Sequence, residues 1–586
     1  MKTLNDYTKE SKKLDKSKLD KKIKIALLSN FTIKWFNDVL QSLCYNNKIN
    51  AEVYIVPYNQ YSQEVLNDKS DLYSFNPNLI ILILDIKKLL GQKYDFPYKL
   101  TPKERKAYIE EIYNNLIALL ENLNKKTQAK VVINNFKVPL YSSMGILENK
   151  QDFGIVESIK FLNKKLQEYA KKTSQIFVFD FQGFCSKLGY DKVTDKKLDY
   201  MADMKISPKL IPRICEEYMA YIIPLLSMTK KCLVLDLDNT VWGGIIGEDG
   251  LEGIKLGPEK EGLPYLEFQK KILNLFYRGV ILAINSNNNP EDVFKVMKEH
   301  PYMLLKEAHF ASMRINWNDK VSNMIEIAKE INIGLDSLVF IDDDKRNREL
   351  IKNKLPEVTV IEMPEDISLY PEVIDNIKVF NTLNITKDDL HRGKMYAQQR
   401  RRQTYLSKAT NIDDFLKQLN IKITLYKANS FNIPRIAQLT QKTNQFNMTT
   451  KRYLEEDIRK FSKSNNYLVY CVRVEDKFGD NGITGVIIIE KNLKEWLIDT
   501  FLLSCRVIGR KIEDVIISKT IEKAKQANAQ KLIGSFIPTN KNKPAEDFYK
   551  NFGFRLKEQK KEKTIWEFNI NKTLPKIIEN ITITEK

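Results

Sequence analysis

The sequence predicts a multidomain α/β protein, and three observations lead to this prediction. The chain has 586 residues, more than a single hydrophobic core ordinarily accommodates. Between residues 22 and 353, short apolar runs typical of buried parallel strands alternate with amphipathic stretches typical of helices. Beyond residue 412 strands and helices are mixed. We therefore expect a doubly wound N-terminal domain, a Rossmann-like central domain and a smaller α+β C-terminal domain.

The first domain is expected over residues 22–228, after a polar extension of residues 1–21. Amphipathic stretches such as 104–126 separate its apolar runs, which predicts a parallel sheet with helices on both faces. The expected strands are KIKIALLSNF (22–31), AEVYIVPY (51–58), NLIILILD (78–85), AKVVINNF (129–136) and QIFVFDFQGF (175–184).

The second domain is expected over residues 229–378, with strands at CLVLDL (232–237), GVILAINS (279–286) and SLVFIDDD (337–344). A charged helical stretch, 379–411, then connects it to a third domain over 412–570, and residues 571–586 form a tail. The third domain's expected strands are YLVYCVRV (467–474), ITGVIIIE (483–490) and EWLIDTFLL (495–503).

Composition argues against several classes of protein. The net charge of +19 is spread along the chain, and its tightest cluster is QQRRRQTY (398–405), so nucleic-acid binding is not expected. The longest apolar run, 79–90, is interrupted by charges and too short to cross a bilayer, and the lysine-rich N-terminus lacks a signal-peptide core. We expect a cytoplasmic protein without a membrane segment. Its six dispersed cysteines are expected to be reduced and to be mostly packing thiols.

Four motifs of the second domain follow strands or lie in loops. LDLDNT carries Asp236, Asp238 and Thr240; LAINS ends in Ser286; INWNDK ends in Lys320; and VFIDDDKRN carries a run of three aspartates, 342–344. Carboxylates are costly to bury unless a cation or several donors meet them, so a metal or phosphate site is indicated at the strand ends.

In type and order these motifs resemble those of the HAD superfamily of aspartyl-phosphate phosphotransferases. The resemblance implies that Asp236 attacks phosphorus, Asp238 protonates the leaving oxygen, and Ser286 and Lys320 hold the phosphoryl oxygens. It also implies Mg²⁺ as the cofactor. The expected metal ligands are Asp236, the backbone carbonyl of Asp238, Asp342 and, as second choice, Asp343.

The spacing of these motifs leaves no room for a separate cap domain. Thr240 and Ser286 lie 46 positions apart, and Ser286 and Lys320 lie 34 apart, enough for a helix or two with loops. We expect a site open to bulky substrates, such as a group tethered to a protein.

A longer resemblance is to the FkbH-like family, HAD subfamily IIIC. It covers residues 22 to 570 and is carried by LDLDNTVWGGIIGEDG, RINWNDKVSN, SLVFIDDD, LTQKTNQFNMTTKRY, FGDNGITG and FLLSCRVIGRKIE. The resemblance implies removal of phosphate from a small phosphorylated acid such as 1,3-bisphosphoglycerate, with transfer of its glyceryl unit to the phosphopantetheine thiol of an acyl carrier protein. Plain phosphatase activity in a surface-polysaccharide or secondary-metabolite pathway is the first alternative. The second is a non-catalytic protein that docks a carrier.

The resemblance also assigns the flanking domains. The first is SGNH-hydrolase-like, but residues 22–228 contain no histidine to activate a serine such as Ser29, so we expect it to be non-hydrolytic. The last is similar to GNAT acyltransferases, whose phosphate-binding loop matches Arg506, Gly509 and Lys511, with a lysine in place of a small residue. Cys505 beside it is either a packing thiol or a thioester site.

One position departs from the family. Many FkbH-like proteins carry Cys before the serine of the second motif, where this chain has Asn285. An amide is no nucleophile, which leaves direct attack by a carrier thiol, relay through a cysteine such as Cys505, or simple dephosphorylation.

Overall fold

The computed structural model describes residues 2–17, 19–406, 416–560, 562–572 and 581–586. These residues divide into two compact units, Met1–Met228 and Thr229–Lys586. The first contains one sheet and the second contains two. The α/β multidomain class predicted from the sequence is confirmed.

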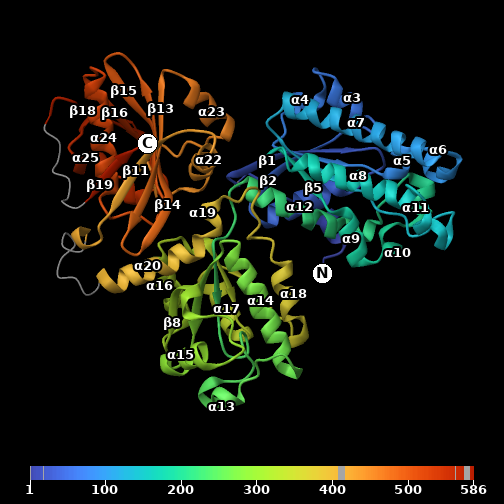
Figure 1. Ribbon diagram of the computed structural model, residues 1–586, viewed down its shortest axis with the longest axis horizontal. Coiled ribbons are helices and arrows are strands. Elements are labelled where there is room, and N and C mark those ends of the chain that lie inside the picture. The colour runs from blue at the N-terminus through green and yellow to red at the C-terminus, as the bar shows by residue number, and fades with distance from the viewer. Residues whose placement is uncertain (1, 18, 407–415, 561, 573–580) are drawn as a thin grey trace. The chain divides into compact units, whose positions relative to one another are not determined.

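The first unit is built on a parallel sheet of order β2-β1-β3-β4-β5. Successive residues of β1 point to opposite faces, so Ile25 and Leu27 enter one apolar cluster while Ala26 and Leu28 enter another. One cluster includes α2 and α12, the other α7 and α8, as in a doubly wound sheet (Figure 1). The strands are β1 (Lys21–Ser29), β2 (Ile49–Ile55), β3 (Leu79–Ile83), β4 (Lys130–Asn134) and β5 (Ile176–Phe179). The four helices named here are α2 (Phe36–Asn46), α7 (Pro102–Lys126), α8 (Ile155–Ala170) and α12 (Ile211–Leu225).

The N-terminal extension, expected only to be polar, contains a helix. Helix α1 (Leu4–Ser11) begins with a capping box at Thr3 and Asp6. Its Tyr7 is buried, and the Tyr7 carbonyl accepts a hydrogen bond from Ser42 on α2. Tyr7, together with the partly buried Leu4, therefore ties this segment to the core of the first unit.

The central sheet of the second unit is also parallel, with order β10-β9-β6-β7-β8. Its two outer strands, β8 and β10, were not predicted. Alternation along β6 again feeds two cores: Leu233 and Leu235 pack with α14, whereas Cys232 and Val234 pack with α16. The strands are β6 (Cys232–Leu235), β7 (Ile281–Ser286), β8 (Phe310–Ile315), β9 (Leu338–Ile341) and β10 (Thr359–Val360), and the two helices are α14 (Leu263–Tyr277) and α16 (Lys320–Ile331).

Helices α19 (Lys387–Leu390) and α20 (Arg392–Leu406) lie in the expected connecting stretch, of which residues 407–411 are outside the described residues. The third sheet is largely antiparallel, with order β17-β18-β16-β15-β14-β13-β11-β19 and parallel pairs at β15–β16 and β11–β19. Five of its strands are β11 (Lys422–Lys427), β16 (Lys531–Phe536), β17 (Arg555–Lys560), β18 (Lys563–Asn569) and β19 (Thr582–Glu585). One core contains α24 and the other α22. The elements used below are α22 (Ile433–Lys442), α23 (Glu455–Lys463), β13 (Tyr467–Asp476), β14 (Gly479–Lys491), β15 (Glu495–Leu503) and α24 (Ile512–Gln526).

The described helices include none that is both long and apolar enough to span a membrane. All six cysteines are free thiols, five of them buried and Cys505 partly exposed. Burial raises the pKa of Cys44, Cys185 and Cys471 to about 12. These three thiols therefore stay protonated and unreactive near neutral pH, as expected of packing residues.

Candidate functional site

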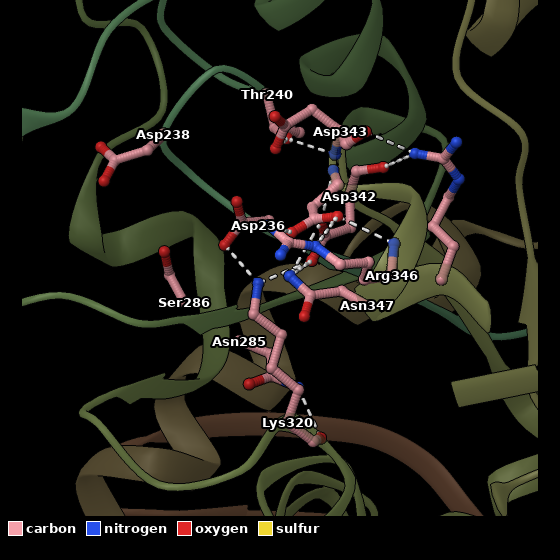
Figure 2. Close-up of polar contacts among 12 residues, drawn as sticks. Asp236, Asp238, Thr240, Asn285, Ser286, Lys320, Asp342, Asp343, Arg346 and Asn347 are labelled. Atoms are coloured by element: carbon pink, nitrogen blue, oxygen red, sulfur yellow. Dashed lines mark hydrogen bonds and ion pairs between the residues drawn. The ribbon is translucent and has the colours of Figure 1, made fainter. Parts of the chain in front are cut away.

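The strands of the central sheet bring the predicted site residues to one edge. Asp236 follows β6, Ser286 ends β7 and Asp342 follows β9. Because these strands are parallel neighbours, their carboxyl ends meet at the same edge. Lys320, the first residue of α16, completes the group (Figure 2). The structure thus brings the four sequence motifs together.

Lys320 bridges two carboxylates. Its Nζ lies 2.7 Å from Asp236 Oδ1 and 2.6 Å from Asp342 Oδ2, and all three side chains are buried. Burial acts to lower the pKa of Lys320, but the charges of Asp236 and Asp342 outweigh it and raise this pKa overall. The ammonium group is therefore held charged where it can neutralise added negative charge.

Three carboxylates could hold a divalent cation. One oxygen from each of Asp236, Asp342 and Asp343 lies within 4.8 Å of the others. Burial, followed by the neighbouring carboxylates, raises the pKa of Asp343 to about 6. Burial and the charge of Asp236 likewise raise the pKa of Asp342 despite the opposing charge of Lys320. Oxygen-only ligands that repel one another in the absence of a cation fit a hard ion such as Mg²⁺.

This repulsion predicts a pH dependence in the metal-free protein. Because the pKa of Asp343 is raised to about 6, the folded state binds more protons than the unfolded state between pH ~4 and ~6. The free energy of unfolding should therefore fall as pH rises through that window. Asp343→Asn should remove this part of the fall, as measured by thermal unfolding in a chelator across the window.

Asp344→Asn provides the matched control, because the pKa of the Asp344 carboxyl is lowered and its side chain is more exposed than that of Asp343. Asn is also an effective N-cap residue, the role that Asp344 has at α17 (Lys345–Lys354). Parallel unfolding profiles of the parent protein and Asp343→Asn would contradict the assigned repulsion.

Asp238 and Ser286 lie on the other side of Asp236 from Asp342 and Asp343 (Figure 2). Asp238 accepts hydrogen bonds from Trp242 Nε1 (2.9 Å), the Ile246 amide (3.2 Å) and Asn288 Nδ2 (3.0 Å). Burial raises the pKa of Asp238, although these donors oppose the shift. A carboxyl with a raised pKa is suited to give and take a proton.

Several supporting residues were not assigned roles from the sequence. Asn288 donates to both Asp238 and Ser286, and Thr240 exchanges hydrogen bonds with Asp343. Arg348 is buried and donates to the carbonyls of Asp342 and Asp343, while Asn347 donates to the Asp342 carboxylate. Thr240 belongs to the first motif, Asn347 ends the fourth and Arg348 directly follows it, so nearness to the motifs in sequence was the available signal.

Asn285 has a structural role. It is fully buried, its Nδ2 donates to the Lys320 carbonyl at 2.9 Å, and its Oδ1 accepts from Asn323 at 3.2 Å. Both ends of the amide therefore serve to hold the start of α16, from which the Lys320 side chain reaches the carboxylates.

The chain between the motifs forms short elements. Helices α13 (Ile246–Gly253) and α14 lie between Thr240 and Ser286. Helix α15 (Pro290–Glu299) and strand β8 lie between Ser286 and Lys320. Neither described interval contains a further sheet.

The residues expected to bind a cofactor in the third domain do not share one surface. Gly509 and Lys511 are exposed in the loop before α24, both at positive φ (+80° and +57°), whereas Arg506 is buried.

In the first domain, Ser29 is buried, and the Asn30 side chain forms hydrogen bonds with the Asp85 backbone. His300 and His309 each accept a hydrogen bond from a nearby backbone amide.

Comparison with known proteins identifies the first domain and a larger structural relative. Residues 24–223 match the family model for the FkbH N-terminal domain. A crystal structure of the N-terminal part of BF1531 from Bacteroides fragilis, described as containing a phosphatase domain complexed with Mg, is 27% identical, with a TM-score of 0.60. The match covers 66% of this chain and all of that one. No curated protein sequence matches.

Acetyltransferase structures match a smaller part. The ribosomal-protein-S18-alanine N-acetyltransferase of Escherichia coli is 12% identical over 26% of this chain and 96% of its own, with a TM-score of 0.21. A GNAT family acetyltransferase from Elizabethkingia anophelis with acetyl-CoA bound is 14% identical over 25% of this chain and 97% of its own, with a TM-score of 0.19. TM-scores this low support no conclusion about the activity of this chain. Residues 24–223 are therefore similar to the FkbH N-terminal domain, and about two thirds of the chain resembles a structure that contains a phosphatase domain.

Proposed function

We propose that the protein is a Mg²⁺-dependent enzyme of the HAD type that removes phosphate from a small phosphorylated acid. The observation that carries this proposal is the contact of Lys320 Nζ with Asp236 and Asp342 beside a third carboxylate, Asp343. The similarity to a phosphatase-containing protein crystallised with Mg supports it. Both Asp236 and Asp238 are present, which argues against a purely non-catalytic docking protein.

The residues divide the work of phosphoryl transfer. An Asp236 oxygen attacks phosphorus and forms an acyl-phosphate bond while the bond from phosphorus to the leaving oxygen breaks. Asp238 gives its proton to that oxygen and then takes one from the water that attacks phosphorus and regenerates Asp236. Lys320 and Ser286 hold the phosphoryl oxygens. Mg²⁺ held by Asp236, Asp342, Asp343 and the Asp238 carbonyl would supply charge neutralisation.

The match to the FkbH model favours a second candidate, acyl transfer to a carrier protein. In this reaction a phosphopantetheine thiol attacks the acyl carbon of an acyl phosphate such as 1,3-bisphosphoglycerate. The carbon–oxygen bond breaks, phosphate leaves, and Asp238 accepts the thiol proton. Asn285 directly precedes Ser286, and its amide cannot hold the acyl group. The thiol therefore attacks the acyl carbon directly unless a distant cysteine relays the group.

Relay through Cys505 is not supported by its position. The Cys505 carbonyl accepts a hydrogen bond from Asn332, which follows the end of α16, and the Cys505 side chain interacts electrostatically with Lys231. Lys231 immediately precedes β6, whereas Asp236 immediately follows it. The thiol is therefore near the opposite edge of the central sheet from the carboxylates.

The two candidate reactions can be separated by intact-mass measurement. The protein is incubated with 1,3-bisphosphoglycerate, Mg²⁺ and a phosphopantetheinylated carrier, and both proteins are then weighed. Phosphate release without an adduct supports the phosphatase, and a glyceryl adduct on the carrier but none on the enzyme supports direct transfer. Absence of phosphate release from this substrate and from a panel of small phosphorylated acids would overturn both. An enzyme adduct lost in Cys505→Ala would overturn the structural argument against relay.

The contacts of Asn285 give a further prediction. Asn285→Ala should lower the rate of phosphate release by about 10- to 100-fold, because Lys320 loses a positioning hydrogen bond. The apparent affinity for Mg²⁺ should change less, since Asn285 touches none of the three carboxylates. Unchanged turnover in Asn285→Ala would show that the amide does not position Lys320. Asn289→Ala is the control and should keep the parent rate, because the Asn289 side chain is exposed and follows the LAINS motif.

A further inference from the structure

The first motif is longer than the proposed reaction requires. LDLDNTVWGGIIGEDG begins with Asp236, Asp238 and Thr240, but its second half, which starts at Trp242, has no task in that reaction. Trp242 is fully buried, and the N–H group of a buried indole needs a hydrogen-bond acceptor. Its acceptor is the carboxylate of Asp238, at 2.9 Å from the Trp242 nitrogen.

The backbone folds back on itself to make this contact. The amides of Thr240 and Val241 donate to the Leu237 carbonyl at 3.1 and 2.7 Å, which closes a tight turn after β6. Gln269 on α14 is fully buried, and its Nε2 donates to the Val241 carbonyl at 3.0 Å. The indole is therefore carried by a turn that is itself held to the core of the central domain.

Two glycines follow the indole and keep the chain close to its neighbours. A Cβ on Gly243 would lie 2.7 Å from the Tyr265 ring, and Gly244 has a φ of +93°, a conformation that favours glycine. The Ile246 amide then donates to Asp238 Oδ1 at 3.2 Å. The WGGII part of the motif thus supplies two of the donors that hold this carboxylate.

The second motif leads to the third donor. Asn288 is only 4% exposed, and its Nδ2 lies 3.0 Å from Asp238 Oδ2 and 3.1 Å from Ser286 Oγ. An amide nitrogen carries two hydrogens, so it can serve both groups at once. Asp238 and Ser286 lie on the same side of Asp236 (Figure 2). One side chain therefore fixes the group assigned to proton transfer relative to a group assigned to hold the phosphoryl oxygens.

These contacts distinguish the two oxygens of Asp238. Oδ1 accepts from Trp242 and from the Ile246 amide, which uses both lone-pair directions of that oxygen. In the part of the chain that the structure describes, Oδ2 accepts from Asn288 alone, so one of its lone-pair directions stays open. Oδ2 is therefore the oxygen that can carry and exchange a proton.

Proton transfer matters most for a poor leaving group. An alkoxide is a strong base and needs a proton as its bond to phosphorus breaks, whereas a nitrophenolate or a carboxylate leaves as a stable anion. We propose that Trp242 and Asn288 are positioning residues that hold Asp238 for proton transfer through Oδ2, and that they thereby determine how poor a leaving group the enzyme releases.

This role deepens the proposed phosphatase function and rests on it. As the bond between phosphorus and the leaving oxygen breaks, the proton on Asp238 Oδ2 moves to that oxygen. The leaving group departs as an alcohol, and Asp238 becomes a carboxylate that its three donors stabilise.

A comparison of two kinds of substrate tests this role in the full-length protein with Mg²⁺. The good leaving group is provided by the faster of p-nitrophenyl phosphate and acetyl phosphate. The poor one is provided by the fastest alkyl phosphate in a panel of small phosphorylated acids such as 3-phosphoglycerate. The measured quantity is kcat/KM, which reports the steps up to departure of the leaving group and not the later hydrolysis that all substrates share.

Trp242→Phe keeps the aromatic ring but lacks the N–H group. It should lower kcat/KM for the alkyl phosphate by on the order of 10-fold or more, and kcat/KM for the good leaving group by less than about 3-fold. Asn288→Ala should give the same selective loss, which keeps the test decisive if the change at buried Trp242 impairs folding.

Two control variants match these changes. Trp566→Phe removes another indole N–H, which donates to Thr564 in the third domain, and Asn289→Ala changes the exposed neighbour of Asn288. Both should retain the parent values of kcat/KM for both kinds of substrate.

The outcomes separate this inference from the proposed function. Absence of phosphate release from every substrate in the parent protein would overturn both. Release in the parent, with an equal fall of kcat/KM for both kinds of substrate in Trp242→Phe and Asn288→Ala or with no fall in either variant, would overturn the inference alone. A parent protein that hydrolyses the aryl or acyl phosphate but no alkyl phosphate would also overturn it.

Discussion

Asp236→Asn is expected to abolish phosphate release, with a loss of at least ~10³-fold, while the fold is retained. An amide keeps the shape of the side chain but cannot form the acyl phosphate, and it no longer pairs as an anion with Lys320 at 2.7 Å. The measurement is phosphate release under saturating Mg²⁺, with thermal unfolding to confirm that the variant is folded.

Asp344→Asn is the control for this variant, since the same chemical change is made two residues from Asp342 on a side chain that caps α17. It should retain most of the activity. If Asp236→Asn turned over with an unchanged Mg²⁺ dependence, the nucleophile would have to be assigned elsewhere.

Asp342→Ala is expected to weaken Mg²⁺ binding and activity together, by on the order of 10²-fold in activity. Asp342 is fully buried and accepts hydrogen bonds from Lys320 Nζ and, at 2.8 Å, from the Asp344 amide. Its loss removes an anionic ligand and leaves Lys320 paired with Asp236 alone. Mg²⁺ titration of phosphate release measures both effects.

Asp342→Asn separates a folding defect from a loss of ligand charge, because the amide can still accept the backbone hydrogen bond. It should show the same weakening of Mg²⁺ dependence. A titration curve of Asp342→Ala that superimposes on that of the parent would move the principal ligand role to Asp343.

The sequence was sufficient to predict the two parallel sheets because their strands are buried on both faces. Runs such as Ile25–Leu28 and Cys232–Leu235 are apolar throughout, a pattern that distinguishes them from the surrounding amphipathic helices. The site was predictable for a related reason: polar residues directly after such strands, as at Asp236 and Asp342, must meet at the carboxyl edge.

Other features depend on contacts that sequence patterns do not encode. Strand β8 carries polar residues at Ser312 and Arg314, which pair with Glu330 on α16, so its sequence lacks a continuous apolar run. The role of Asn285 as an anchor for Lys320 depends on a carbonyl 35 positions away.

If Asp236 is the nucleophile, it carries the phosphoryl group between the two halves of the reaction, and trapping that group tests this role most directly. The protein is mixed with Mg²⁺ and a phosphorylated substrate from which it releases phosphate, and the reaction is quenched in acid within the first turnover. The protein is then digested, and its peptides are analysed by mass. We expect one added phosphoryl group on the peptide that contains Asp236 and none on the corresponding peptide of Asp236→Asn. Rapid phosphate release with that peptide unmodified at every quench time, or a phosphoryl group on another residue, would contradict it.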